Sequence, residues 1–288
     1  MHALDKLKEA NKFLSQNGIE DSIREAEIII INSLGIDRTV LYRDNPMLSK
    51  SQLKKINKFL KRRTKREPLQ YIIGYVDFYG LKIKLGKGVL IPRPETELLV
   101  EKAIEIIKRE ALSVKCILDL CTGSGCIALA LAREFPKAKV YGTDISEIAI
   151  RYAKENANIN RINNVTFLVG NLFEPVEQFV MHNASRTTFN IIISNPPYIR
   201  RDDIKTLQPE IKDWEPIKAL DGGEDGLDYY RVIIPESKSY LRQGGYLIIE
   251  MGENQSEKVR KIAEESGFTN IFLIRDYAGI ERIFVAKN

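Results

Sequence analysis

The sequence of 288 residues is poor in the residues that bind metals or form disulfide frameworks. It has two histidines, His2 and His182, and three cysteines with no CxxC pair among them. Zinc sites and disulfide-rich folds need more of these residues at closer spacing, so we expect neither. Cys116, Cys121 and Cys126 cannot all pair, and we expect small buried thiols in a reducing compartment.

Long apolar runs are also missing. None approaches the ~20 residues that a membrane-spanning helix needs, and residues 1–6 lack the apolar core of a signal peptide. There is no internal repeat and no low-complexity tract, although 44% of the residues are hydrophobic. We therefore expect a cytoplasmic protein of one large or two modest domains that does not act at a membrane.

Charge is unevenly distributed along the chain. Residues 1–92 carry a net charge of +8, and the remainder carries −3. The densest basic run, residues 61–66, is expected to be a solvated helix end, where cations complement the helix dipole. The same run could also contact an acidic protein or an RNA-rich particle.

The spacing of apolar residues changes along the chain, from a helical pattern to short strands and then to alternating strands and helices. This succession predicts two domains joined by a linker. Residues 1–74 predict a small helical domain, with helices over residues 4–14, from residue 21 or 22 to Gly35, and from Ser49 or Ser51 onward. Residues 75–92 predict a β-hairpin linker with short strands at 75–79, 81–85 and 89–91.

Residues 93–288 predict an α/β domain with a doubly wound, mostly parallel, seven-stranded sheet. Pro94 suits the first turn of a helix, and strands and helices then alternate. The last two strands are expected to form an antiparallel edge pair. The predicted strands are residues 116–120, 140–144, 165–169, 190–194, 246–250, 270–274 and 282–286.

The most informative motif is Asn195-Pro196-Pro197-Tyr198, directly after an apolar strand. Two prolines make a rigid corner at the carboxyl end of that strand, where open α/β sheets bind ligands. The Asn195 amide oxygen and the Pro196 carbonyl could accept both hydrogens of a planar NH2 group, and Tyr198 could stack on it. The alternative is a strand-ending turn with a core tyrosine.

A glycine-rich turn follows an earlier strand and opens a helix. Gly123, Gly125 and Ala128 match the dinucleotide fingerprint G-x-G-x-x-G/A, which alone is a weak signal. Asp144 ends the next strand roughly 20 residues later, where such folds hold a ribose diol. Its alternative role is a cap for the helix that starts near Ser146.

These features fit both NAD and S-adenosylmethionine. Asp119 lies two residues before the turn, and a carboxylate there suits a cationic ammonium better than a pyrophosphate. The turn also lacks the GxxxxGK[ST] pattern that would indicate ATP. Together with the NPPY corner, Asp119 favours a methyl donor.

The motifs resemble those of the HemK/PrmC family of protein-(glutamine-N5) methyltransferases, which act on peptide chain release factors. The resemblance covers nearly the whole chain. Its more specific signals are the PRPETE and LDGGEDGL blocks, whereas NPPY is shared with adenine-N6 methyltransferases. The matching segments are residues 91–97, 118–132, 195–199, 219–228 and 250–252.

The resemblance implies a class I, Rossmann-like methyltransferase fold with S-adenosylmethionine as cofactor and S-adenosylhomocysteine as product. It places the acceptor amide at residues 195–198 and the adenine near Asn171 and Leu172. Here the chain departs from the family, which often has Asp-Trp at these positions. The implied cofactor residues are Asp119, Cys121, Thr122, Gly123, Ser124, Gly125, Asp144, Asn171, Leu172 and Asn195.

The expected reaction is methyl transfer to the amide of the glutamine in the Gly-Gly-Gln loop of class I release factors. The helical domain would grip the release factor, and residues 196–228, with Trp214, would face the substrate. We expect a monomer that requires neither metal nor nucleic acid. The alternatives are an adenine-N6 methyltransferase of DNA or RNA, which would flip a base, and a binding module without turnover.

Overall fold

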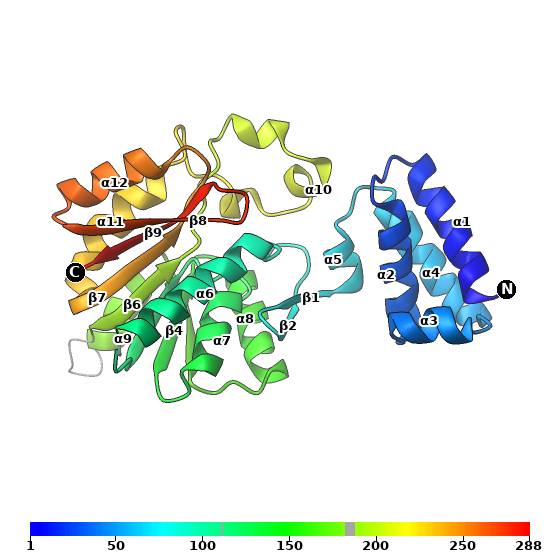
Figure 1. Ribbon diagram of the computed structural model, residues 1–288, viewed down its shortest axis with the longest axis horizontal. Helices are drawn as coiled ribbons and strands as arrows, with labels where there is room; N and C mark the ends of the chain where they lie inside the picture. The colour runs from blue at the N-terminus through cyan, green and yellow to red at the C-terminus, as the bar shows by residue number, and fades with distance from the viewer. Residues whose placement is uncertain (111, 182–187) are drawn as a thin grey trace. The chain divides into compact units, whose positions relative to one another are not determined.

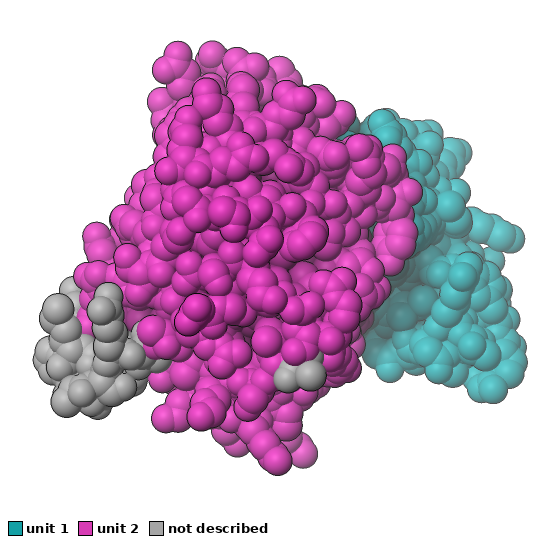
Figure 2. Space-filling view, turned by 60° about the vertical axis from the view of Figure 1, so that its left-hand side comes forward, with its two compact units in different colours: residues 1–75, 208–214 teal, residues 76–207, 215–288 magenta. Residues whose placement is uncertain are grey.

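The computed structural model describes residues 1–110, 112–181 and 188–288, so His182 lies outside the described residues. The chain forms two compact units, coloured separately in Figure 2. Unit 1 comprises Met1–Tyr75 and Gln208–Trp214, and unit 2 comprises Val76–Leu207 and Glu215–Asn288. Within the described part of the chain, no helix combines the length and the apolar character needed to cross a membrane.

Unit 1 is helical, as predicted, but has three more helices than the periodicity indicates. The helices α3, α5 and α10 have seven, five and four residues, too few to display an apolar stripe. The helices of this unit are α1 (Ala3–Gln16), α2 (Ser22–Leu34), α3 (Arg38–Asp44), α4 (Lys50–Arg63), α5 (Leu69–Ile73) and α10 (Pro209–Lys212).

Local signals in the sequence set the ends of the longer helices in unit 1. Ser49 and Gln52 form a capping box, in which each side chain accepts the backbone N–H of the other residue. Gly35 ends α2 in the left-handed conformation with φ 68°, which glycine adopts without strain. Both predicted ends are confirmed.

The basic run at residues 61–66 differs from the expectation of a solvated helix end. Arg63 is buried, and its guanidinium donates to the carboxylates of Glu25 and Glu210. Glu210 also accepts from Arg66. These ion pairs fasten residues 208–214 to the helices of unit 1.

Unit 2 begins with a two-stranded hairpin, β1 (Tyr75–Phe78) and β2 (Leu81–Lys84). The predicted third strand at residues 89–91 is absent from the described structure, and that expectation was wrong. Its polar backbone has another partner, because the N–H of Ile91 donates to the buried carboxylate of Glu215.

The predicted seven-stranded sheet is confirmed, with the order β5-β4-β3-β6-β7-β9-β8 (Figure 1). Strand β9 is antiparallel to both β7 and β8, and the other pairs are parallel. The strands are β3 (Cys116–Leu120), β4 (Lys139–Asp144), β5 (Val165–Val169), β6 (Phe189–Ser194), β7 (Leu241–Glu250), β8 (Asn270–Arg275) and β9 (Glu281–Lys287).

Strand β7 starts at Leu241, five residues before the predicted start at Tyr246. Gly244 lies inside the strand with φ 74°, and the pairing of β6 with β7 shifts register between Phe189 and Ile191. Gly244 therefore accompanies an irregularity within the strand.

Helices cover both faces of the sheet, because β-branched and leucine side chains point alternately to each face. Ile191 and Ile193 pack with α6, α7 and α8, whereas Ile192 packs with α11 and α12. The helices of unit 2 are α6 (Pro94–Arg109), α7 (Cys126–Glu134), α8 (Glu147–Ile159), α9 (Glu174–Met181), α11 (Asp228–Tyr240) and α12 (Ser256–Glu265), with short 3₁₀ turns η1 (Asp203–Thr206) and η2 (Ile217–Ala219).

The order of the strands places a switch point between β3 and β6. The chain runs outward from β3 through β4 to β5 and then returns to add β6 on the other side of β3. Leu120 pairs with Ser194 in this parallel register. The loops that follow these two strands diverge from one edge, where sheets of this kind bind ligands.

Two asparagines of α8 pair with the backbone of β2 in the same way. Asn156 holds the N–H and C=O of Lys84 and also donates to the carbonyl of Ser124 in the glycine-rich loop. Asn160 holds the N–H and C=O of Lys82, but at a more exposed position.

We predict that Asn156→Ala lowers the free energy of unfolding by roughly 2–4 kcal/mol, because it leaves several buried backbone groups unpaired. Asn160→Ala should cost less than about 1 kcal/mol, because water can replace its side chain. Urea denaturation of the two variants measures the difference. Equal losses would contradict the bridging role of Asn156.

Candidate active site

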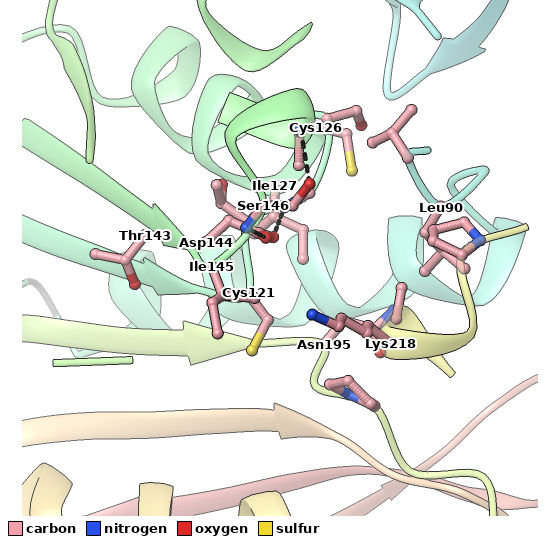
Figure 3. A pocket seen from close by; sticks show the side chains of 18 of the residues that line it. Leu90, Cys121, Cys126, Ile127, Thr143, Asp144, Ile145, Ser146, Asn195 and Lys218 are labelled. Atoms are coloured by element: carbon pink, nitrogen blue, oxygen red, sulfur yellow. Dashed lines mark hydrogen bonds between the residues drawn. The ribbon is translucent and has the colours of Figure 1, made fainter. Parts of the chain in front are cut away.

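A cavity of about 400 Å³ lies in unit 2 at the carboxyl ends of β3, β4 and β6. Figure 3 shows Cys121, Asp144 and Asn195, which follow or end these strands, around the same space. The predicted site residues that line it are Cys121, Thr122, Gly123, Ser124, Asp144, Asn171, Leu172, Asn195 and Pro197.

Four predicted residues are outside this lining: Asp119, Gly125, Pro196 and Tyr198. Gly125 instead packs inward at the start of α7 with φ 80°, and a Cβ there would lie 2.8 Å from the Phe167 ring and 2.9 Å from the Ala153 Cβ. Its glycine is required by packing and conformation together, since an L side chain is strained at this φ.

Asp119 is fully buried beneath the glycine-rich loop. Its Oδ2 accepts from the Thr122 hydroxyl at 2.5 Å and from the Ala128 backbone N–H at 3.1 Å. Its Oδ1 has no hydrogen-bond partner among the residues that the structure describes. Burial raises the pKa of Asp119 to about 7. The carboxylate therefore holds the loop from below and keeps one unpaired oxygen.

Asp144 holds the two chain segments that flank the cavity. Its Oδ2 accepts from the Gly123 backbone N–H at 2.9 Å, and its Oδ1 accepts from the Ser146 N–H at 2.8 Å. The Ser146 side chain itself caps α8 by accepting from Ala149. Burial raises the pKa of Asp144. Each carboxylate oxygen retains a second lone pair for a hydroxyl donor.

The corner after β6 is anchored on both sides. The Ser194 hydroxyl donates to the Leu120 carbonyl at 2.8 Å, which ties β6 to β3. Asn195 Nδ2 donates to Thr96 Oγ1 at 3.0 Å. The Pro196 carbonyl accepts no hydrogen bond within the described part of the chain. Two oxygen acceptors, Asn195 Oδ1 and this carbonyl, therefore lie at one corner.

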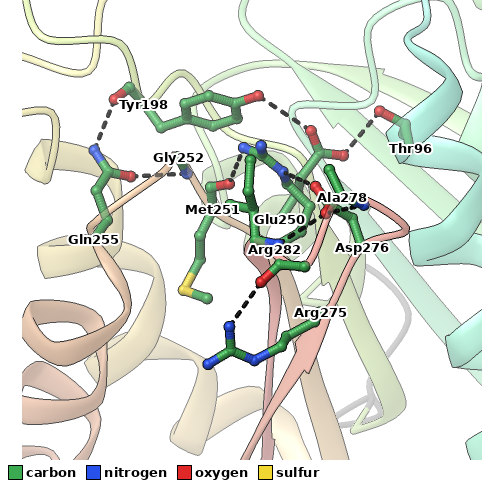
Figure 4. A network of polar contacts seen from close by, with 12 residues as sticks. Thr96, Tyr198, Glu250, Met251, Gly252, Gln255, Arg275, Asp276, Ala278 and Arg282 are labelled. Carbon is green, nitrogen blue, oxygen red and sulfur yellow. Dashed lines mark hydrogen bonds and ion pairs between the residues drawn. The ribbon is translucent and has the colours of Figure 1, made fainter.

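A buried carboxylate that sequence reasoning did not assign lies behind this corner. Glu250 accepts from the Thr96 hydroxyl at 2.8 Å and from the Tyr198 hydroxyl at 3.2 Å (Figure 4). Burial raises its pKa to about 7. The sequence held one signal, a glutamate that ends the otherwise apolar run Leu247-Ile248-Ile249.

Two further segments of the cavity lining are joined by an ion pair. Residues 88–90 and Pro92 contribute to the lining, as do residues 216–219. Arg93 pairs with the buried Glu215, which also accepts from Ile91. This pair holds the PRPETE segment beside η2.

Among the described residues there is no group of three or more histidine, cysteine, aspartate or glutamate side chains that could hold a metal ion. The thiols of Cys121 and Cys126 line the cavity, and burial raises the pKa of each. Both are therefore protonated near neutral pH and act as polarisable apolar lining.

Family models match both parts of the chain. The model of a methyltransferase domain matches residues 113–280, and the model of the PrmC N-terminal domain matches residues 5–74.

Relatives match the chain over its full length. The sequence is 48% identical over 288 residues to the release factor glutamine methyltransferase of Thermodesulfovibrio yellowstonii, covering 100% of this chain and 98% of that protein. It is 42% identical over 273 residues to the release factor glutamine methyltransferase of Geobacter sulfurreducens, with coverages of 94% and 91%.

Solved methyltransferase structures share the fold. A 16S rRNA methyltransferase of T. thermophilus, in complex with AdoMet and guanosine, has a TM-score of 0.52 at 19% identity and covers 74% of this chain and 49% of that chain. A methyltransferase from Pyrococcus furiosus has a TM-score of 0.52 at 18% identity, with coverages of 72% and 89%. The expected methyltransferase fold is confirmed.

We predict that Asp119→Asn becomes more stable relative to the wild type as the pH rises. The carboxyl has a higher pKa folded than unfolded, so between about pH 4 and 7 the folded wild type binds more protons and loses stability as pH rises. The amide oxygen can take the place of Oδ2 and carries no charge.

Urea denaturation of the ligand-free protein at pH 5 and pH 8 measures this effect. The difference between variant and wild type should grow by roughly 1–3 kcal/mol, since one pKa unit corresponds to about 1.4 kcal/mol. Asp225→Asn is the control. Arg231 lowers the pKa of Asp225 to about 2, so this carboxyl stays ionised in the folded and in the unfolded protein between pH 5 and pH 8. The difference in stability between this variant and the wild type should therefore stay constant. A constant difference for Asp119→Asn would show that its carboxyl titrates normally.

Proposed function

Because the chain belongs to the release factor glutamine methyltransferase family, we propose that its substrate is the Gly-Gly-Gln loop of class I peptide chain release factors. The enzyme transfers a methyl group from S-adenosylmethionine to the side-chain amide nitrogen, N5, of the glutamine, and S-adenosylhomocysteine leaves as product. The observation that carries this proposal is the pair of oxygen acceptors at the Asn195-Pro196 corner.

The cavity suits S-adenosylmethionine in size and in its mixture of groups. Apolar side chains such as Ile127 and Ile145 suit the adenine and thioether parts, and the carboxylate of Asp144 suits a ribose diol. We assign the adenine contact to the backbone of Leu172 and the amide of Asn171. The cofactor supplies a methyl group on a sulfonium, which is already a strong electrophile.

The glycine-rich loop is proposed to hold the amino-acid end of the cofactor. Cys121, Thr122, Gly123 and Ser124 line the cavity there. Asp119 acts through this loop, which it braces by its hydrogen bond to Thr122. A cationic ligand nearby favours the ionised form of Asp119, because opposite charges lower the pKa of a carboxyl.

The NPPY corner is proposed to bind and orient the acceptor amide. Asn195 Oδ1 and the Pro196 carbonyl accept its two N–H groups, Pro197 walls the site, and the Tyr198 ring stacks on the amide plane. Holding both hydrogens weakens conjugation of the nitrogen lone pair and directs it to the methyl carbon. No general base is required, because the methylated nitrogen is cationic and sheds a proton readily.

The names of the relatives specify a release factor glutamine, so they give no support to the alternative of an adenine-N6 methyltransferase on DNA or RNA. We propose that the helical unit grips the release factor body and that residues 196–228 face its loop. We also propose that the enzyme works as a monomer in the cytoplasm, where translation terminates, without nucleic acid.

Incubation with labelled S-adenosylmethionine and a purified class I release factor tests the function directly. Label should enter the intact factor and should be absent when the loop glutamine is replaced by alanine, because that substitution removes only the acceptor amide. Mass spectrometry of the loop peptide then places the methyl group. Transfer of label to added DNA or RNA, with none to the factor, would refute the proposal.

We predict that Asn195→Ala lowers kcat about 100-fold, since removing one preorganised hydrogen-bond partner of a reacting group has effects of this size. Affinity for S-adenosylmethionine, measured by calorimetry, should change less than about 3-fold, because the side chain acts on the acceptor. A collapse of cofactor binding with kcat intact would assign Asn195 to the cofactor instead.

A further inference from the structure

Glu250 connects the two side chains that the proposed mechanism needs at the corner. Its Oε2 accepts from Thr96, and its Oε1 accepts from Tyr198. Thr96 Oγ1 in turn accepts from Asn195 Nδ2 at 3.0 Å. A single buried carboxylate at the end of β7 therefore contacts Tyr198 and Thr96 directly (Figure 4) and reaches Asn195 through the Thr96 hydroxyl.

The direction of these hydrogen bonds decides how the Asn195 amide faces. A hydroxyl has one proton to donate. When Thr96 gives that proton to ionised Glu250, its oxygen can only accept, so Asn195 must present Nδ2 to it. The amide oxygen, Oδ1, is then turned away from Thr96 and is available to the acceptor amide.

We propose that Glu250 is a positioning residue for methyl transfer, which acts through Thr96 to present the oxygen of the Asn195 amide to the substrate. This inference rests on the proposed function, because it assumes that the substrate group at Asn195 is an NH2 donor.

Protonation of Glu250 would reverse the direction of the two hydrogen bonds that link Asn195, Thr96 and Glu250. A protonated Oε2 donates to Thr96 Oγ1, and the hydroxyl proton is then free to point at Asn195. That arrangement favours Asn195 with Oδ1 toward Thr96 and Nδ2 toward the substrate. Two NH2 groups would then face each other, and the acceptor amide would not be held.

The surroundings of Glu250 allow its carboxylate to gain a proton near neutral pH. Burial is the largest influence and raises its pKa to about 7, and Glu95 on α6 also raises it. The hydroxyls of Thr96 and Tyr198 and the guanidinium of Arg282 on β9 lower the pKa.

The remaining neighbours bind the backbone of this segment or neutralise Arg282. Tyr230 on α11 donates to the Glu250 carbonyl at 3.1 Å. Arg282 donates to the Met251 carbonyl and pairs with Asp276 at 3.3 Å. The full positive charge of Arg282 is therefore shared with Asp276, and the carboxylate of Glu250 is stabilised chiefly by hydroxyl donors.

The test is the pH dependence of single-turnover methyl transfer to a purified release factor. For the wild type, the rate should fall about 10-fold between pH 8 and pH 6, as expected for a group with a pKa about 7 that must be ionised. Affinity for S-adenosylmethionine should stay within about 3-fold over this range.

Glu250→Gln removes the charge of the Glu250 side chain and keeps its size and shape. Its amide oxygen can accept from Thr96 while its Nε2 donates to Tyr198, and neither group titrates. Its rate should therefore vary less than about 2-fold from pH 6 to pH 8. If the variant keeps the wild-type fall, a different group titrates, such as Asp119, and the proposal is wrong.

Variants of Thr96 test whether the effect passes through the hydroxyl. Thr96→Val should lower the single-turnover rate at least 10-fold and abolish the fall at low pH, while Thr96→Ser should restore both. A Thr96→Val enzyme that keeps the pH dependence of the wild type would contradict the proposal that Glu250 acts through the Thr96 hydroxyl.

Tyr230→Phe is the matched control, because it removes the hydrogen bonds from the Tyr230 hydroxyl to the Glu250 carbonyl and to Gln255 and leaves the carboxylate untouched. It should lower thermal stability and keep the wild-type pH profile. If this control also lost the pH dependence, the effects of the Glu250 and Thr96 variants would be merely structural, and the proposal would be wrong. Absence of transfer by the wild type at pH 8 would count against the proposed function itself, whereas transfer without the pH dependence would count against the role of Glu250 alone.

Discussion

The parallel pairing of β3 with β6 is the constraint on which the site depends. Leu120 and Ser194 are neighbours in this register, and the Ser194 hydroxyl donates to the Leu120 carbonyl. Because both strands are buried on both faces, neither can slip without moving its side chains into the wrong layer. The glycine-rich loop and the NPPY corner, about 70 residues apart in sequence, therefore leave the sheet side by side.

Around this edge the enzyme keeps two carboxylates in apolar surroundings, Asp119 and Glu250, each with a pKa raised to about 7 by burial. Such groups reduce stability and persist where hydrogen bonds compensate for them. Asp119 supports the glycine-rich loop from below, and Glu250 supports the NPPY corner from behind. The cavity thus has a charged support on the side proposed for each of its two ligands.

Much of the fold and most of the cavity could be predicted from local patterns. Apolar runs marked every strand of the main sheet, and the glycine-rich turn, Asp144 and the NPPY corner all contribute residues to one cavity. Short helices such as α3 were missed, since seven residues carry no clear periodicity. The strand expected at residues 89–91 failed because Glu215, more than 120 residues away, takes the backbone N–H of Ile91.

By itself, the sequence determined the class of fold, the order of the strands along the chain and the chemical character of the NPPY corner, because these depend on the local spacing of apolar residues, glycines and prolines. Only the tertiary structure decided which polar groups meet. Thr96, Asn195 and Glu250 come from three distant segments, and their hydrogen bonds exist because α6, β6 and β7 pack together. Pairing of this kind depends on distances between elements, which no local pattern encodes.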